Sequence, residues 1–148
     1  MRGRGTAARP YQSEPWAADV EGVIRSTRLP ARGSQFTRLL LADDASSPTL
    51  QAALIGAVGS RKDTYDFAIV ALARDVRVAQ AGVGDDMLAD FDSWCRTHAD
   101  GRETLELAAA IHVDNLPAQR LAAGNGWEEG INLDGDRRYA YWGKQLQV

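Results

Sequence analysis

The chain has 148 residues, of which 45% are hydrophobic and 25% charged, and its formal net charge is −3. These values are ordinary for one globular domain that buries most of its apolar side chains. The acidic balance argues against a nucleic-acid-binding surface that covers the whole domain. Cys95 is the only cysteine, which excludes an intrachain disulfide and a cysteine-rich metal site.

The first residues carry charge without an apolar segment behind them, which is not the pattern of a secretory signal. No window reaches the roughly 18 apolar residues that a membrane span needs. We therefore expect residues 1–15 to form a disordered basic arm and residues 16–148 to form one domain of a cytoplasmic protein without a membrane partner. The spacing of apolar residues from Pro15 to Leu29 favours a helix, although its second half, from Val23, would also suit a strand.

Antiparallel strands are expected in the next part of the chain, at Phe36–Leu41, Thr49–Val58 and Thr64–Ala73, each bounded by turn-forming residues. The run Phe67–Leu72 is apolar throughout. Such a run suits a strand that is buried in the middle of a sheet.

A glycine turn, Gln80-Ala81-Gly82-Val83-Gly84, precedes the clearest helix. One apolar stripe runs along this helix, formed by Met87, Leu88, Phe91, Trp94, Cys95 and His98. We therefore expect Cys95 to lie in the core, His98 to pack along the stripe, and Asp100-Gly101 to end the helix.

The rest of the chain alternates again between strand and helix. A strand is expected at Thr104–Val113, then a short helix capped by Asn115 with Pro117 in its first turn, and a terminal strand at Arg137–Leu146. This order of elements predicts an α/β or α+β protein with a sheet that carries helices on its faces.

Three motifs from about Tyr65 onward resemble those of the GCN5-related N-acetyltransferase family. Gly82 and Gly84 match the glycines of the family's pyrophosphate loop. The family pattern Asn-x-x-Ala-x-x-Leu, followed by Gly and an aromatic residue, is matched by Asn115, Ala118, Leu121, Gly126 and Trp127. The tail Arg138–Leu146 resembles the closing strand.

This resemblance implies a mixed, mostly antiparallel sheet with an acyl-CoA cleft between two splayed central strands, and acetyl-CoA as the co-substrate. The amides that would meet the pyrophosphate belong to Gln80, Ala81, Gly82, Val83, Gly84 and Asp85. The residues that would lie along the pantetheine arm are Leu72, Ala73, Arg74 and Asn115. An ordinary glycine connection between a strand and a helix is the alternative interpretation of the turn.

The chain departs from the family pattern at three places. Ala79 stands at the Gln/Arg position of the loop, although Gln80 is its neighbour. Asp85 and Asp86 occupy the first helical turn, where they suit the helix dipole but repel a diphosphate. Ala122 stands where the family usually has a catalytic tyrosine, so that Tyr139, Tyr141, a water or no general acid would protonate the departing thiolate.

Direct transfer to an amine needs a general base. His112, near the end of the strand that would line the cleft, has the side chain most suited to this role. The alternative is a structural histidine whose hydrogen bonds are made on the sheet face. Asp75 and Glu106, which shares the side of His112, are further candidates, and a solvated or salt-bridged role is the alternative for each. Cys95 is expected in the core rather than as a nucleophile, and the cysteine and two histidines do not form a metal site.

Two functional hypotheses follow. The first is an acetyl-CoA-dependent N-acetyltransferase in which a small-molecule or protein amine attacks the thioester directly. The second is a catalytically degenerate binding or interaction module, favoured by Ala122 and the Asp85-Asp86 pair. A toxin that acetylates aminoacyl-tRNA is disfavoured by the acidic charge, so no nucleic-acid partner is expected. A homodimer remains open, because interface packing would explain the C-terminal aromatic residues as well as core packing does.

Overall fold

The structure is a computed structural model, and it describes Ala17, Gly22, Val23, Ser26 and residues 33–42, 49–74, 81–130 and 135–148. The elements in these ranges are β1 Gln35–Ala42, β2 Thr49–Val58, β3 Phe67–Arg74, α2 Val83–Thr97, β4 Thr104–His112, α3 Leu116–Gly124, β5 Glu128–Glu129 and β6 Tyr139–Gln147. The expected arm at residues 1–15 lies outside the described residues. Most of the helix expected from Pro15 to Leu29 also lies outside them, and its four described residues are helical.

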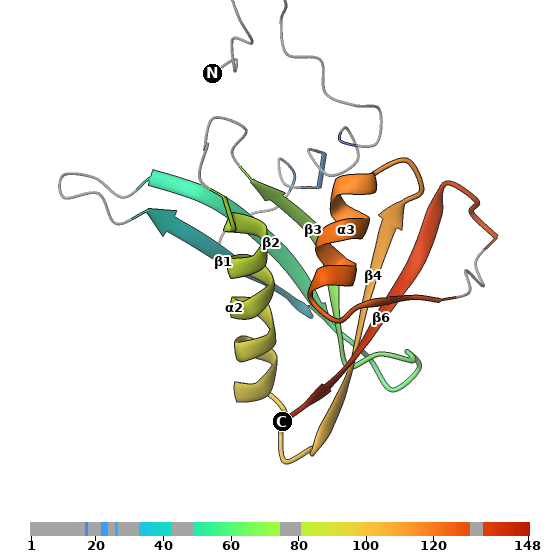
Figure 1. Cartoon of the computed structure of the whole chain (residues 1–148). Coiled ribbons are helices and arrows are strands. Elements are labelled where there is room, and N and C mark those ends of the chain that lie inside the picture. Colours follow the sequence, from blue (N-terminus) through green and yellow to red (C-terminus); the bar gives the residue numbers. More distant parts are fainter. Residues whose placement is uncertain are drawn as a thin grey trace, which may run out of the picture.

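The strands form one six-stranded sheet in the order β1-β2-β3-β4-β6-β5. Every neighbouring pair is antiparallel except β3 and β4, which run parallel. Both α2 and α3 cover the same face of this sheet (Figure 1). The mixed, mostly antiparallel sheet with flanking helices that the sequence predicted is therefore confirmed, with β3 in its middle.

Two strand starts differ by two or more residues from the sequence-based expectation. β3 begins at Phe67 rather than Thr64, because Ser60 and Asp63 form a turn in which the Asp63 carboxylate accepts hydrogen bonds from the Ser60 amide and hydroxyl. β6 begins at Tyr139 rather than Arg137, because the Arg138 amide donates to the Asp136 carboxylate in a preceding turn. The two-residue β5 was not expected at all.

The apolar stripe of α2 packs as expected, with one exception. Its buried residues are Val83, Met87, Leu88, Phe91 and Cys95. His98 packs, as expected, but outside the core. The helix ends at Thr97 and His98 is its exposed C-cap, where its ring stacks on Trp94 at 3.9 Å between centroids. Asp100 and Gly101 then turn the chain with φ angles of 55° and 79°.

Aromatic rings join α2 to the first strands of the sheet. The Phe36 ring of β1 stacks on Trp94 of α2 at 3.8 Å between centroids and lies 6.1 Å from Phe91. Gly56 of β2 lies directly under this ring, since a Cβ there would come within 2.1 Å of the Phe36 Cζ. Arg38 adds a bidentate ion pair to Asp90 of α2, with both N–O distances 2.7 Å. This half of the molecule is therefore tightly filled.

Candidate functional site

The two central strands separate part of the way along their length. β3 pairs with β4 only from Phe67 to Ile69, although β3 continues to Arg74 and β4 to His112. The register between β2 and β3 shifts at the same point: Ile55 pairs with Ala71 and Gly56 with Ile69, so that Val70 is an extra residue on β3. Such a bulge bends its strand. Beyond it, the edge of β3 faces β4 across a fork and has no strand partner among the described residues; we call it the free edge.

A cavity of about 130 Å³ fills the fork. It is lined by Ile69, Val70, Ala71 and Leu72 of β3, Ala109, Ala110, Ile111 and His112 of β4, Leu88 of α2, Asn115, Ala118, Leu121 and Ala122 at α3, and Trp127 and Tyr139. Most of this wall is apolar and much of it consists of alanines. The sequence resemblance predicted an opening between these two strands. It did not predict the contribution of α3, although Ala118, Leu121 and Ala122 have the spacing of one helix face.

The cavity has two different sides, because alternate residues of β4 point to opposite faces of the sheet. Leu105 and Leu107 belong to the core under the helices and Ile111 packs against that core, so the helices cover this side of the fork. His112 is out of phase with these three residues and points to the other side. A polar mouth on one face thus leads to an apolar interior on the other.

The glycine turn brings the N-terminus of α2 close to α3. Gly82 precedes the helix with a φ of 86°, and the first intrahelical hydrogen bond runs from the Asp86 amide to the Gly82 carbonyl, at 2.9 Å. The amides of Val83, Gly84 and Asp85 therefore precede the helical ladder and have no intrahelical acceptor. A Cβ on Gly84 would lie 2.7 Å from a Leu121 methyl. Gln80 and Ala79 lie outside the described residues.

The acidic residues after this turn differ in their contacts. The Asp85 carboxylate accepts a 2.8 Å hydrogen bond from the side-chain amide of Asn125, which also donates to the Leu121 carbonyl. Asp85 thereby ties the start of α2 to the end of α3. Asn125 is a residue that sequence reasoning missed, and its only sequence signal was its place at the C-cap of α3. Asp86 is exposed.

Three residues at or next to α3 line the interior of the cavity. The Asn115 side-chain oxygen accepts from the Ala118 amide at 3.2 Å and so caps α3, as predicted, while Asn115 also lines the cavity. Ala122 lines the cavity and is buried, so that α3 brings no hydroxyl to it at this position. Trp127 is 3% exposed, and its indole N–H has no partner among the described residues.

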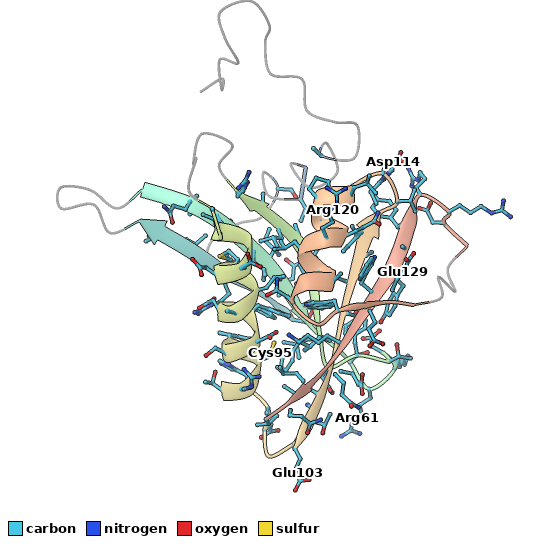
Figure 2. All side chains as sticks on the ribbon, viewed as in Figure 1. Arg61, Cys95, Glu103, Asp114, Arg120 and Glu129 are labelled. Carbon is cyan, nitrogen blue, oxygen red and sulfur yellow. The ribbon has the colours of Figure 1, made fainter. Side chains whose placement is uncertain are left out.

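His112 and Tyr139 form the polar mouth. They pair across β4 and β6, and their rings meet edge to face at 5.3 Å between centroids. The Nδ1 atom of His112 accepts a 3.1 Å hydrogen bond from the Asp114 amide. The neutral imidazole in this geometry therefore carries its proton on Nε2. Asp114 and Arg120 lie at the same end of the sheet as the open fork, opposite Glu103 (Figure 2).

An ion pair between Arg138 and Asp136 lies next to this mouth. Arg138 binds both oxygens of Asp136 through its guanidinium, with distances of 3.1 and 2.9 Å, and lies over the Tyr139 ring at 5.7 Å. Hydrogen bonds from the Arg138 side chain and amide are the main cause that lowers the pKa of Asp136, and the charge of Arg138 adds to the effect.

The other predicted residues are not brought to the cavity or are not described. Glu106 shares a face of β4 with His112, as expected, but lies six residues away, or about 20 Å along an extended strand. Its carboxylate accepts from the Gln145 side chain at 3.0 Å. Asp75 lies outside the described residues. Ala73 and Arg74 lie on the free edge of β3 beyond Leu72.

The remaining chemistry-bearing side chain, Cys95, is buried in the core, as expected. Burial raises the pKa of its thiol to about 12, so the thiolate that a nucleophile requires is scarce. The part of the chain that is described contains no group of three or more His, Cys, Asp or Glu that could hold a metal ion. It also contains no helix that is both long and apolar enough to cross a membrane.

No protein-family model matches the sequence, and no curated protein matches it. Solved structures do match. A protein from Bacillus anthracis assigned as a streptothricin acetyltransferase, solved with acetyl coenzyme A, has a TM-score of 0.58 at 15% identity. The match covers 79% of this chain and 64% of that protein, so this chain spans less than two thirds of its length.

Two further solved structures of acetyltransferases also match this fold. An IAA acetyltransferase from Bacillus cereus has a TM-score of 0.56 at 12% identity, with 76% of this chain and 79% of that one covered. A protein from Bordetella pertussis assigned to the GNAT family has a TM-score of 0.52 at 17% identity, with coverages of 95% and 82%. Identities this low carry the fold and not the activity. The chain therefore has the fold of the GCN5-related N-acetyltransferases, as a divergent sequence.

Proposed function

We propose that the chain is an acyl-CoA-dependent N-acyltransferase, with acetyl-CoA as the simplest donor and an amine as the acceptor. The observation that carries the proposal is the fork: the bulge at Val70, the free edge of β3 and the cavity that starts where the pairing of β3 with β4 ends. Extended pantetheine carries amide groups, which suit hydrogen bonding to a free strand edge. The likeness of the fold to acetyltransferases supports the same interpretation.

The residues around the fork fit the successive parts of coenzyme A. The amides of Val83, Gly84 and Asp85 lack intrahelical acceptors, which suits a phosphate. The backbone of Val70 to Arg74 would pair with the pantetheine arm. The Asp85 and Asp86 carboxylates oppose this fit through charge repulsion, so we expect an affinity lower than an uncharged first turn would give.

The mouth of the cavity supplies groups for the transfer step. A bound acyl-CoA supplies an activated thioester carbonyl. The acceptor amine would form the new C–N bond as the C–S bond breaks, and one proton must leave the amine. We propose His112 as the group that takes it, directly or through a water. Because Nδ1 accepts from the Asp114 amide, this role requires the ring to release that hydrogen bond or to exchange tautomers.

Tyr139 is the proposed proton donor to the departing thiolate. It faces His112 across the mouth, and Ala122 supplies no hydroxyl. Glu106 is not proposed for the transfer step, because it lies about 20 Å from His112 along β4. The acceptor is proposed only as a small-molecule or protein amine.

Replacement of His112 tests its role. We expect His112→Gln to lower the rate of amine acylation about 100-fold, because the variant has no general base at this position. Glutamine retains an oxygen that can accept from the Asp114 amide, so a purely structural histidine would be rescued by it. The assay is free-thiol release from acetyl-CoA with a panel of amines. A near-normal rate in His112→Gln would contradict the proposed base.

A catalytically degenerate binding module is the second candidate, and Ala122 together with Asp85 and Asp86 favours it. Thermal unfolding with and without CoA separates the candidates in combination with the thiol-release assay, because a ligand of the native state raises its stability. Binding with thiol release supports the enzyme, and binding without thiol release for any amine supports the module. No shift in Tm at millimolar CoA would contradict both.

A further inference from the structure

An acidic side chain stands next to the proposed phosphate position, in the first turn of α2. Gly82 is the N-cap of this helix and Val83 its first residue, so that Asp85 is its third. An acid at this place can turn its carboxylate back to the free amides at the start of the helix and satisfy them itself. A carboxylate in that position would occupy the donors that a ligand's phosphate needs.

In this structure the carboxylate of Asp85 is bound to α3 instead. Its 2.8 Å hydrogen bond from the side-chain amide of Asn125 is the only one that the Asp85 side chain makes within the described part of the chain. The same amide nitrogen donates to the Leu121 carbonyl at 2.8 Å. Because both partners are acceptors, the NH₂ end of Asn125 must face them, and both of its hydrogens are used.

The backbone of Asn125 is fixed by two further hydrogen bonds. Its amide donates to the Ala122 carbonyl at 3.0 Å, and its carbonyl accepts from the Lys144 ammonium at 2.8 Å. Lys144 is itself held by the Asp92 carboxylate at 2.6 Å. A side chain anchored in this way loses little further conformational freedom when it holds a partner.

The first turn of α2 faces two successive turns of α3. Leu121 and Asn125 are one helical turn apart and share a face, and a Cβ on Gly84 would lie 2.7 Å from a Leu121 methyl. We propose that Asn125 is a positioning residue for phosphate binding, which holds the Asp85 carboxylate against α3 and so leaves the free amides of the turn to the ligand. This inference rests on the proposed function, since it names a residue that prepares the same site.

A double-mutant cycle on the dissociation constant for CoA, measured by calorimetry with the whole chain, tests this role. Asn125→Ala should weaken CoA binding about fivefold, because the released carboxylate of Asp85 can then cap its own helix. In an Asp85→Ala background the same substitution should change the affinity less than about twofold, since no carboxylate is left to compete. Asp86→Ala provides the matched control background, because Asp86 is the neighbouring exposed acid and Asn125 donates to Asp85 instead. In that background Asn125→Ala should still weaken binding about fivefold.

A second ligand separates positioning from loosened packing. Pantetheine lacks the diphosphate, so its affinity should be the same in Asn125→Ala as in the unaltered chain. Disturbed packing between α2 and α3 would weaken the binding of pantetheine together with that of CoA. Should Asn125→Ala fail to fold, Asn125→Ser replaces it with the same expected results, since serine is shorter and also lacks the amide donor.

The outcomes separate this inference from the function on which it rests. An unchanged CoA affinity in Asn125→Ala, or an equal loss in the Asp85→Ala background, would overturn the role of Asn125 and leave the proposed function standing. A parallel loss of pantetheine affinity would do the same. Absence of CoA binding by the unaltered chain would overturn both.

Discussion

The two helices cover neighbouring parts of one sheet face and pack on it in opposite ways. Under α2, the rings of Phe36, Phe91 and Trp94 stack closely, and Gly56 makes room for one of them. Under α3, alanines leave a cavity in the fork between β3 and β4. Filled cores resist change and open ones admit ligands. We therefore expect stability to depend mainly on the α2 half and the proposed binding to depend mainly on the α3 half.

The largest loss of stability should come from removing a buried ring in the tightly packed α2 half. Phe91 is 0% exposed and lies against both Phe36 and Trp127. We expect Phe91→Ala to lower the free energy of unfolding by about 3–5 kcal/mol, because it removes a buried ring and leaves a cavity. Leu121→Ala, in the α3 half, should cost about 1 kcal/mol, because Leu121 already borders a cavity and is half-buried.

Denaturant unfolding of both variants measures this difference. Equal losses of stability would mean that the two halves are packed alike, and would contradict the comparison.

A second effect concerns the link between α2 and β6. The Lys144 ammonium lies 2.6 Å from the Asp92 carboxylate and 2.8 Å from the Asn125 carbonyl, and both charged side chains are largely buried. We expect Asp92→Ala to lower the free energy of unfolding by about 2–3 kcal/mol, because it leaves a buried ammonium without its counter-ion. The double variant Asp92→Leu with Lys144→Met should recover much of this loss. A double variant less stable than Asp92→Ala would show that the pair itself stabilises the fold.

The smallest effect concerns the proposed diphosphate position at the N-terminus of α2. Asp85→Asn keeps an oxygen that accepts from Asn125 and removes one negative charge near the proposed diphosphate position. We expect CoA to bind about fivefold more tightly, a gain of about 1 kcal/mol that decreases with added salt, and the stability of the free protein to stay unchanged. Glu103→Gln, at the opposite end of the sheet (Figure 2), is the control that removes a charge without effect on binding. Weaker binding by Asp85→Asn would show that the Asp85 charge supports the site.

The filled half was the easier one to predict from the sequence. The stripe Met87, Leu88, Phe91 and Cys95 has the helical period, and a strand such as Thr49–Val58 ends at clear turn residues. His98 continued the period but falls after the last helical residue, and helix ends are set by local hydrogen bonds that periodicity does not report. β5 has two residues, both glutamate, and carries no strand pattern.

The open half was predicted only in outline. The extra residue Val70 is recognised only from the register between β2 and β3, which skips it, since its apolar run has no sequence mark of a bulge. The alternation of β4 placed Glu106 on the side of His112, but a shared face does not bring two residues together when they lie six positions apart. The contact of Asp85 with Asn125 joins residues from two helices and could not be derived from either segment alone.

Amide hydrogen exchange tests most directly whether the fork is the acyl-CoA site. The amides of Val70 to Arg74 that point away from β2 have no partner on β4, so they should exchange rapidly in the free protein. Saturating CoA should slow their exchange, together with that of Val83 and Gly84, and leave β1 unchanged. The same experiment would contradict the account if CoA bound and these amides kept their free-state exchange rates.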